Sequence, residues 1–399
     1  MNKLNELIQK LCPDGVEFQT LENCCHILDN KRKPVTKAAR EAGEYPYYGA
    51  NGIQDYVSDY IFDGVFVLVG EDGSVVTPSG KPVVNWAEGK IWVNNHAHII
   101  EKKSGVLLRY LYHYLQTVNV SALIHGNIPK LTGGDFRAIK VPVPPLPVQD
   151  EIVHILDNFT VLSAELSAEL SARKQQYEHY RDTLLTFDND SVSWFELKDV
   201  IHSLNTGLNP RQFFRLNTED ATNYYVTIRE IRGGRIVPTD KTDRINDEAL
   251  ALCNNRSNLE IGDVLFSGTG TIGETAVIME EPRNWNIKEG VYAIKPNQEI
   301  ILPKYLRYLL TATYIKTTYM KKVAGGTVKS IPMGEMRKLQ IPVPSINEQE
   351  RIVVALDRFD DLCNNLSAGL PAEIEARKKQ YEYYRDKLLT FEEYKENVG

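Results

Sequence analysis

The sequence predicts an α+β fold: two globular α/β units separated by two long antiparallel helices, with an approximate internal two-fold symmetry. The first observation behind this prediction is a repeat, because residues 140–159 recur at 340–359 and residues 173–187 recur at 377–391. The second is a helical spacing of apolar residues through both copies. The third is that each copy follows a segment with the apolar runs and Gly and Asn turns typical of strands.

The repeated stretch has the pattern of one face of a long helix. Apolar side chains recur at steps of three and four residues, and about forty residues at about 1.5 Å each give a helix roughly 60 Å long. Neither helix can bury this face by itself, so we expect the two copies to pack against each other in antiparallel directions. The expected contact residues are Ile152, Phe159, Leu166, Tyr177 and Tyr180 in the first copy, and Ile352, Phe359, Leu366, Tyr381 and Tyr384 in the second.

The two helices are not expected to be equally regular. The first copy contains the tandem repeat Ser163-Ala-Glu-Leu166 and Ser167-Ala-Glu-Leu170, which continues the helical pattern. The second copy has Gly369 and Pro371 in the corresponding region. Because proline lacks the amide hydrogen that an interior helical position requires, we expect the second helix to kink or restart at Pro371.

These patterns divide the chain into four parts: a globular unit at 1–145, a helix at 146–187, a second globular unit at 188–344 and a second helix at 345–399. The first unit is expected to contain strands at 64–69 and 90–93 and a helix at 106–115. The second is expected to contain strands at 263–266 and 289–294 and a helix at 305–310. Residues 4–11 are expected to form a short helix that ends at Pro13.

Composition restricts the class of protein. The 399 residues are 42% hydrophobic, yet no run of 18 apolar residues and no signal peptide is present, so we expect a soluble cytoplasmic protein without a membrane segment. The five cysteines form no Cys-x-x-Cys pair, which predicts reduced thiols. Of the net charge of −7, residues 148–187 and 346–399 carry −4 each, which leaves +1 for the rest of the chain.

Two motifs invite an enzymatic interpretation. Gly268-Thr-Gly-Thr-Ile-Gly273 matches the glycine pattern of a dinucleotide loop, but a strand-like stretch follows it where a phosphate-binding helix should begin, so a hairpin turn is predicted. His96 and His98 would point to one side of a strand without an evident third ligand, which favours hydrogen-bonded histidines over a metal site. We therefore assign no catalytic residue, metal or cofactor to this chain.

Basic and amide side chains instead favour a DNA-binding function. Lys and Arg neutralise phosphates, and Asn, Gln and Arg read base edges in the major groove. Such residues gather in both globular units, and each unit ends with a glycine-rich basic loop. The residues predicted to contact DNA are Lys31, Arg32, Lys33, Lys37, Tyr48, Asn51 and Lys130 in the first unit, and Asn209, Arg211, Gln212, Arg215, Arg232 and Lys329 in the second.

The repeated motif resembles that of a known family. Residues 142–153 and 342–353, each followed by Arg-Lys-x-Gln-Tyr-Glu-x-Tyr-Arg-Asp, are similar to the two conserved regions of the specificity subunit of type I restriction-modification enzymes. The resemblance implies that each globular unit is a target recognition domain for one half of a bipartite, asymmetric site in double-stranded DNA. It implies that the helices form a spacer that docks two methylation subunits and, through them, restriction subunits. S-adenosylmethionine, ATP and Mg are then expected on those partners, with this chain non-catalytic.

Two other interpretations stay open at this point. The chain could be a stand-alone DNA-binding adaptor or coiled-coil scaffold outside restriction, in which case it would not co-purify with a methyltransferase. It could also be a self-sufficient methyltransferase, in which case the isolated chain would bind S-adenosylmethionine.

Overall fold

The structure is a computed structural model that describes residues 2–73, 75–188, 191–326, 328–364 and 369–394. Packing divides the chain into unit 1, Met1–Ala164 with Ala376–Gly399, and unit 2, Glu165–Glu375. Each unit thus contains one globular part and portions of both repeated stretches. The four expected parts, 1–145, 146–187, 188–344 and 345–399, follow the sequence repeat instead, and they stay predictions. No helix in the described residues is both long enough and apolar enough to cross a membrane.

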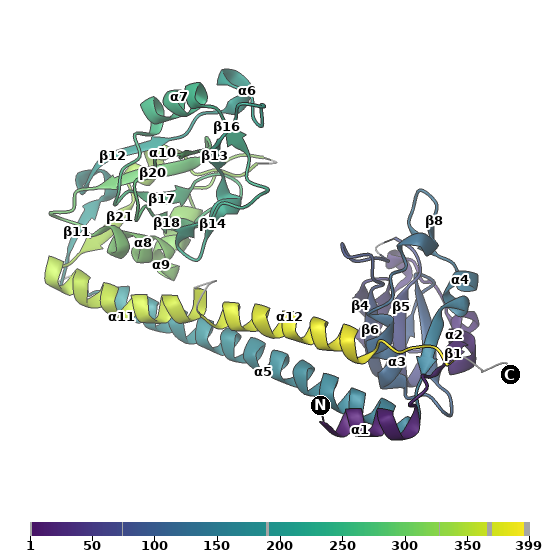
Figure 1. Cartoon of the computed structure of the whole chain (residues 1–399). Coiled ribbons are helices and arrows are strands. Elements are labelled where there is room, and N and C mark those ends of the chain that lie inside the picture. Colours follow the sequence, from purple (N-terminus) through teal and green to yellow (C-terminus); the bar gives the residue numbers. More distant parts are fainter. Residues whose placement is uncertain (1, 74, 189–190, 327, 365–368, 395–399) are drawn as a thin grey trace. The chain divides into compact units, whose positions relative to one another are not determined.

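Unit 1 is built on a mixed six-stranded sheet with the strand order β2-β7-β5-β6-β3-β4 (Figure 1). Most neighbours are antiparallel, whereas β3 and β6 are parallel. The strands are β1 (Glu17–Thr20), β2 (Cys25–Ile27), β3 (Ala42–Gly49), β4 (Gly52–Val57), β5 (Phe62–Gly70), β6 (Val84–Val93), β7 (Ala97–Lys102), β8 (Ile124–His125), β9 (Lys130–Leu131) and β10 (Lys140–Val143); the α-helices of its globular part are α1 (Asn2–Leu11), α2 (Leu21–Cys24), α3 (Leu108–Leu115) and α4 (Gly133–Ala138).

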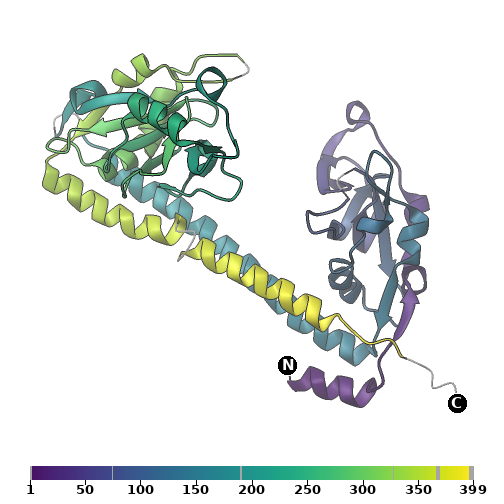
Figure 2. The same cartoon turned by 45° about the horizontal axis from the view of Figure 1, so that its top comes forward.

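Unit 2 is built on an antiparallel four-stranded sheet, β12-β20-β17-β18, and also contains the three-stranded sheet β16-β13-β19. Its globular part is drawn in teal to yellow-green in Figure 2. Its strands are β11 (Ser193–Glu196), β12 (Ile201–Thr206), β13 (Asn223–Val226), β14 (Ile231–Arg232), β15 (Arg235–Ile236), β16 (Arg244–Ile245), β17 (Val264–Ser267), β18 (Thr275–Val277), β19 (Trp285–Ile287), β20 (Val291–Pro296) and β21 (Gln340–Val343); the α-helices of its globular part are α6 (Pro210–Phe213), α7 (Asp247–Ser257), α8 (Pro303–Thr311), α9 (Thr313–Met320) and α10 (Met333–Arg337).

The elements expected from the sequence are present with shifted ends. The expected helix at 106–115 is α3, the one at 305–310 is α8, and the short N-terminal helix is α1. The expected strands are β5, the end of β6, β17 and β20. All five cysteines are free and buried, in agreement with the expected thiols.

The long helices behave as the proline pattern predicts. The first, α5 (Leu146–Leu185), is continuous over 40 residues. The second stretch forms two helices, because α11 (Ile346–Asn364) ends before α12 (Leu370–Leu388) begins, with Pro371 in the first turn of α12. The restart expected at Pro371 is therefore confirmed. Proline is tolerated there because the first amides of a helix have no partner within the helix.

The expected contact residues of the helices are found within each unit. In unit 1, the ring of Phe159 stacks on Tyr384 with centroids 5.5 Å apart. In unit 2, the ring of Tyr180 stacks on Phe359 at 5.4 Å. Each pair joins the first copy of the repeat to the second. Of the others, Ile152, Tyr177 and Ile352 are buried, Leu166 and Tyr381 are half-buried, and Leu366 lies outside the described residues.

A buried glutamine fastens each globular part to the start of its helix. The Gln149 side chain is fully buried, accepts from the Leu107 amide at 2.9 Å and donates to the carbonyls of Gly105 and Pro144. Gln349 accepts from the Leu302 amide at 2.9 Å and donates to the carbonyls of Ile300 and Pro344. The same three bonds therefore close the same junction in both units.

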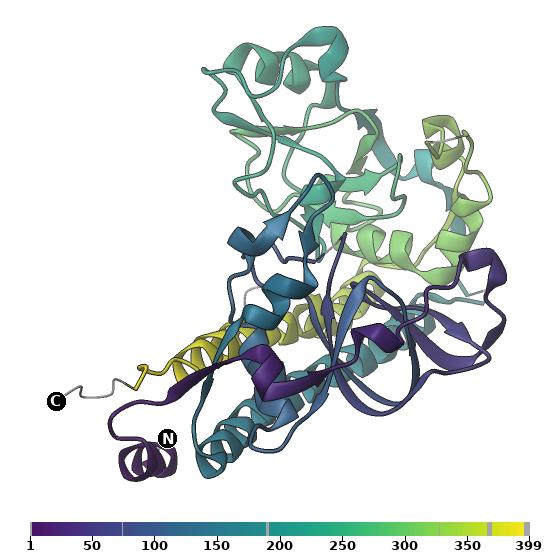
Figure 3. The same cartoon turned by 90° about the vertical axis from the view of Figure 1, so that its right-hand side faces the viewer.

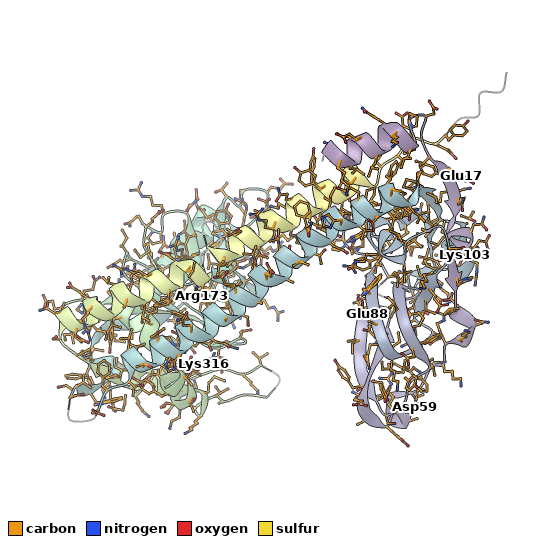
Figure 4. All side chains as sticks on the ribbon, turned by 90° about the horizontal axis from the view of Figure 1, so that it is seen from below. Glu17, Asp59, Glu88, Lys103, Arg173 and Lys316 are labelled. Atoms are coloured by element: carbon orange, nitrogen blue, oxygen red, sulfur yellow. The ribbon has the colours of Figure 1, made fainter. Side chains whose placement is uncertain are left out.

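The two ends of the chain meet within unit 1. The Val16 amide donates to the Glu392 carbonyl at 2.9 Å, and the Tyr394 amide donates back to the Val16 carbonyl at 2.9 Å. Helix α1 lies beside the start of α5, where Lys3 is paired with Glu151, and it also lies close to the end of α12 (Figure 3). Glu17 lies at this end of the globular part and Asp59 at its far end (Figure 4).

Candidate nucleic-acid interface

Four loops of unit 2 meet at one edge of its four-stranded sheet. We define this loop edge of unit 2 as residues 206–212, 267–274, 288–291 and 328–331. The Gly268 amide donates to the Gly290 carbonyl at 2.8 Å, the Gly270 amide donates to the Lys329 carbonyl at 2.9 Å, and the Ile331 amide donates to the Gly268 carbonyl at 2.9 Å. The glycine motif forms the turn between the antiparallel strands β17 and β18, so the predicted hairpin is confirmed.

Unit 1 has the same backbone arrangement at the corresponding edge. We define the loop edge of unit 1 as residues 28–33, 50–51, 71–73, 94–96 and 126–131. The Glu71 amide donates to the His96 carbonyl at 2.8 Å, the Gly73 amide to the Pro129 carbonyl at 3.0 Å, and the Leu131 amide to the Glu71 carbonyl at 2.8 Å. These three bonds match those of unit 2, with Glu71 in the place of Gly268. One frame therefore carries different side chains in the two units.

Glycine permits the close approach of the loops in unit 2. A Cβ atom on Gly268 would lie 2.2 Å from the nearest ring atom of Tyr292, and one on Gly290 would lie 2.8 Å from Cβ of Thr269. Gly270 has a φ of +81°, the left-handed region that glycine adopts without strain. The turn therefore brings the Lys329 loop close to β17 and β18.

Several predicted DNA-binding residues of unit 1 gather at its loop edge. Lys31 and Lys33 are exposed and follow β2, Asn51 is exposed in the turn between β3 and β4, and exposed Lys130 lies on β9. In unit 1, β8 and β9 lie at the end of the globular part that is away from α1 (Figure 1). The structure thus brings together basic and amide side chains that are distant in sequence.

Three other predicted residues of unit 1 are placed differently. The Arg32 side chain is 12% exposed and points inward. Tyr48 is buried among the residues of the sheet, and Lys37 lies on the separate 3₁₀ turn Lys37–Ala39. Their DNA contacts stay predictions, and the burial of Arg32 and Tyr48 favours a structural role for both.

In unit 2, the predicted residues also divide into two groups. Asn209, Arg211 and Gln212 follow β12, and Lys329 pairs with the glycine turn, so these four belong to the loop edge. Helix α6, which carries Arg211 and Gln212, lies at the end of unit 2 away from α11 (Figure 1). Arg215 is exposed beyond α6. Arg232 lies on the β14–β15 hairpin, where its Nε donates to the Arg229 carbonyl at 2.8 Å.

A group of charged side chains holds the loops of unit 1. We call Asp29, Arg32, Glu71, His98 and Lys130 the Glu71 cluster. The Glu71 carboxylate accepts from Arg32 Nη1 at 2.6 Å and pairs with Lys130 Nζ at 3.2 Å. His98 has one ring nitrogen 2.7 Å from the Asp29 carboxylate and the other 3.0 Å from the Leu131 carbonyl oxygen. The cluster therefore links four segments of the chain that are distant from one another in sequence.

Opposite charges are closely balanced in this cluster. Burial acts to raise the pKa of the Asp29 carboxyl, but the hydrogen bond with His98 and the charge of Arg32 outweigh burial, so the pKa lies below its usual value. Ligand atoms of Asp29, Glu71 and His98 lie within 4.8 Å of one another, which is compatible with a metal ion. However, Arg32 and Lys130 already pair with Glu71, so the protein's own cations supply the compensating charge.

Sequence reasoning missed some residues at these edges. Asp72 is hydrogen-bonded to Nδ1 of His96 in unit 1, and Thr269 and Lys288 belong to the loop edge of unit 2. The expectation that His96 and His98 share a strand is wrong: His96 lies in a turn before β7, and only His98 lies in the strand. The sequence did contain a signal for these edges. The two motifs first considered for an enzymatic role, residues 94–98 and 268–273, lie at the loop edges of unit 1 and unit 2.

Two named proteins are similar to this chain in sequence. One is S.HindORF215P of Haemophilus influenzae, whose name describes it as a type I restriction enzyme specificity subunit. It is 36% identical to this chain over an alignment that covers 94% of this chain and 96% of the relative. The other is the type I restriction enzyme EcoR124I/EcoR124II specificity subunit of Escherichia coli. It is 34% identical to this chain over an alignment that covers 71% of each protein.

Solved structures share the fold. One is the crystal structure of the type I restriction-modification system S subunit from M. genitalium, with a TM-score of 0.55 and 14% identity, covering 94% of this chain and 96% of that one. Another, from a study of complex assembly and conformational transition of the type I R-M system, has a TM-score of 0.56 and 15% identity, covering 95% and 98%.

The family described as type I restriction modification DNA specificity domain matches residues 13–173 and 189–376, which together make up most of the chain. The match includes most of both globular parts and both loop edges. This chain therefore belongs to the type I restriction-modification DNA specificity family.

Proposed function

We propose that this chain is the DNA-binding specificity subunit of a type I restriction-modification complex. Its globular parts, 1–145 and 188–344, act as target recognition domains that each read one half of a bipartite, asymmetric site. The observation that carries this proposal is the pair of loop edges: the same backbone hydrogen bonds recur, whereas Glu71 and His96 in one unit are Gly268 and Gly290 in the other. A shared frame with different side chains at equivalent positions suits two readers of different sequences.

The spacer is the second part of the proposal. Residues 146–187 and 345–399 act as paired antiparallel helices between the two recognition domains. The aromatic pairs support this arrangement, because Phe159 meets Tyr384 and Tyr180 meets Phe359, so contacts advance along one copy as they recede along the other. Antiparallel pairing of two copies produces an approximate two-fold axis, and such an axis offers two similar docking places for two identical methylation subunits.

We assign the chemistry to those partners. Methylation with S-adenosylmethionine belongs to the methylation subunits, and ATP- and Mg-dependent cleavage belongs to restriction subunits that dock through them. Base flipping occurs in the methylation subunits, since adenine cannot be methylated inside the duplex. This chain supplies recognition and positioning.

Mapping methylated adenines tests the proposal. The chain is expressed with a type I methylation subunit from the same organism in a host that lacks adenine methylation, and the genome is sequenced for modified bases. The expected result is one asymmetric motif with two specified halves and an unspecified middle. A single uninterrupted motif would contradict the two-reader arrangement. A chain that binds DNA but does not co-purify with a methylation subunit would favour the stand-alone adaptor.

A further inference from the structure

Glu71 lies at the centre of the loop edge of unit 1. Glu71 is 9% exposed. Its backbone amide donates to the His96 carbonyl, and its carbonyl accepts from the Leu131 amide. Its carboxylate pairs with Arg32 and Lys130, and one oxygen lies 3.6 Å from His98 Nδ1. This single side chain therefore connects the loop after β2, which carries Lys31 and Lys33, with Lys130 on β9.

The fold itself does not require this carboxylate. In unit 2, the equivalent position is Gly268, and the same three backbone bonds form without any side chain there. The space beside Gly268 is taken by the ring of Tyr292, which donates from its hydroxyl to the Ile331 carbonyl at 2.5 Å. The role of Glu71 therefore concerns the side chains of unit 1 rather than the backbone frame.

Arg32 is the link between Glu71 and the exposed lysines. Its guanidinium bonds to the Glu71 carboxylate at 2.6 Å, to the Ala97 carbonyl at 2.7 Å and to the Asp29 carbonyl at 2.9 Å. These bonds fix the backbone between Lys31 and Lys33, whose side chains are exposed. A buried carboxylate with two cationic partners is costly to neutralise, because the partners then lose their compensating charge.

We propose that Glu71 is a positioning residue for the half of the DNA site that unit 1 reads. It holds Arg32 inward, presents Lys31 and Lys33 outward, and fixes Lys130 of β9 at the same loop edge. Glu71 itself does not contact DNA. This inference rests on the proposed function and adds to it an asymmetry: recognition by unit 1 depends on a buried anion at a position where unit 2 has Gly268.

The test is a selection from a random DNA library. The full chain in complex with its methylation subunits selects duplexes, and both half-site motifs are determined in one experiment, so the half-site of unit 2 is an internal standard. For Glu71→Gln, which keeps the shape and removes the charge, we expect enrichment of one half-site to fall about tenfold and the other to stay unchanged. Glu71→Asp, which keeps the charge, is expected to retain part of that enrichment.

A matched control is available on the same sheet. Glu88 is exposed on β6, labelled in Figure 4, and accepts a hydrogen bond from Trp86 Nε1 at 2.5 Å outside the Glu71 cluster. Glu88→Gln makes the same change in charge and is expected to leave both half-sites unchanged. If Glu71→Gln fails to fold, the double variant Arg32→Gln, Glu71→Gln removes the anchor without leaving the arginine charge uncompensated, and it is expected to lose the same half-site.

Two results would overturn the inference: both half-sites enriched as in wild type, or equal loss of both half-sites by a folded variant. A separate result would reject the proposed function: a wild-type complex that selects no bipartite motif. The two failures are distinguishable, because the second appears without any substitution.

Discussion

The ring of Phe159 stacks on the ring of Tyr384 at an interplanar angle of 21°, and Phe159 and Tyr384 come from the two copies of the repeated stretch. We expect Phe159→Ala to lower the free energy of unfolding by about 1–3 kcal/mol, because a half-buried ring loses its packing partner. Chemical denaturation measures the change. Val161→Ala on the same helix is the control, since that side chain is 53% exposed, and a cost as large as that of Phe159→Ala would contradict the pairing.

Gln349 provides a test of the junction between helix and globular part. Gln349→Leu keeps the volume but leaves the Leu302 amide and the Ile300 and Pro344 carbonyls without this partner. Buried polar groups without partners are costly, so we expect a loss of about 2–4 kcal/mol in thermal unfolding. Gln340→Leu, at an exposed position on β21, is the matched control. Equal effects would show that the junction bonds contribute nothing specific.

His113 predicts how stability depends on pH. Burial lowers the pKa of His113 to about 4, and the hydrogen bond to Asp157 only partly opposes that shift. The folded protein therefore resists a proton that the unfolded chain accepts near pH 6.5. Between about pH 6.5 and 4 the unfolded state binds more protons, so stability falls as pH falls, by up to ~3 kcal/mol.

His113→Gln is expected to remove this part of the pH dependence. Unfolding curves recorded across the same range measure it. His179, exposed on α5, is the control position, and His179→Gln should leave the slope unchanged. A His113→Gln variant that keeps the wild-type slope would assign the dependence to other groups.

Lys31 and Lys33 are expected to bind phosphates. Replacing each by Gln should weaken binding to all DNA sequences and reduce the slope of log affinity against log salt by about 1 per lysine. Fluorescence anisotropy of the complex at several salt concentrations measures this slope. Lys10→Gln on α1, at the other end of unit 1, is the control and should not change it. An unchanged slope in the lysine variants would place the DNA elsewhere.

Lengthening the continuous helix α5 is expected to change the length of the unspecified middle of the DNA site. A third Ser-Ala-Glu-Leu unit after Leu170 adds about 6 Å of helix, and DNA rises ~3.4 Å per base pair. The preferred middle is therefore expected to change by about one or two base pairs, with both half-sites kept. Maps of methylated adenines measure the result, and a changed half-site sequence would count against a spacer role.

Much of the fold could be predicted because its signals are local or repeated. The helical period and the duplication predict α5, and Pro371 predicts the interruption between α11 and α12. The loop edges could not be predicted, because their hydrogen bonds join positions such as Glu71 and Leu131, which no local pattern relates. Arg32 shows the same limit at one residue: its neighbours Lys31 and Lys33 are exposed, whereas Arg32 turns inward to the Glu71 carboxylate and the Ala97 carbonyl, which are distant in sequence.

The pairing of Val16 with Glu392 and Tyr394 has a consequence for biosynthesis. Unit 2 is one uninterrupted segment, whereas unit 1 also takes in the chain from Ala376 onward, of which residues 376–394 are described. During translation, the globular part that leaves the ribosome first therefore completes its packing only after residues 376–394 have been made. Nonsense mutations that remove residues 376–394 should accordingly damage the earliest-made globular part of the protein.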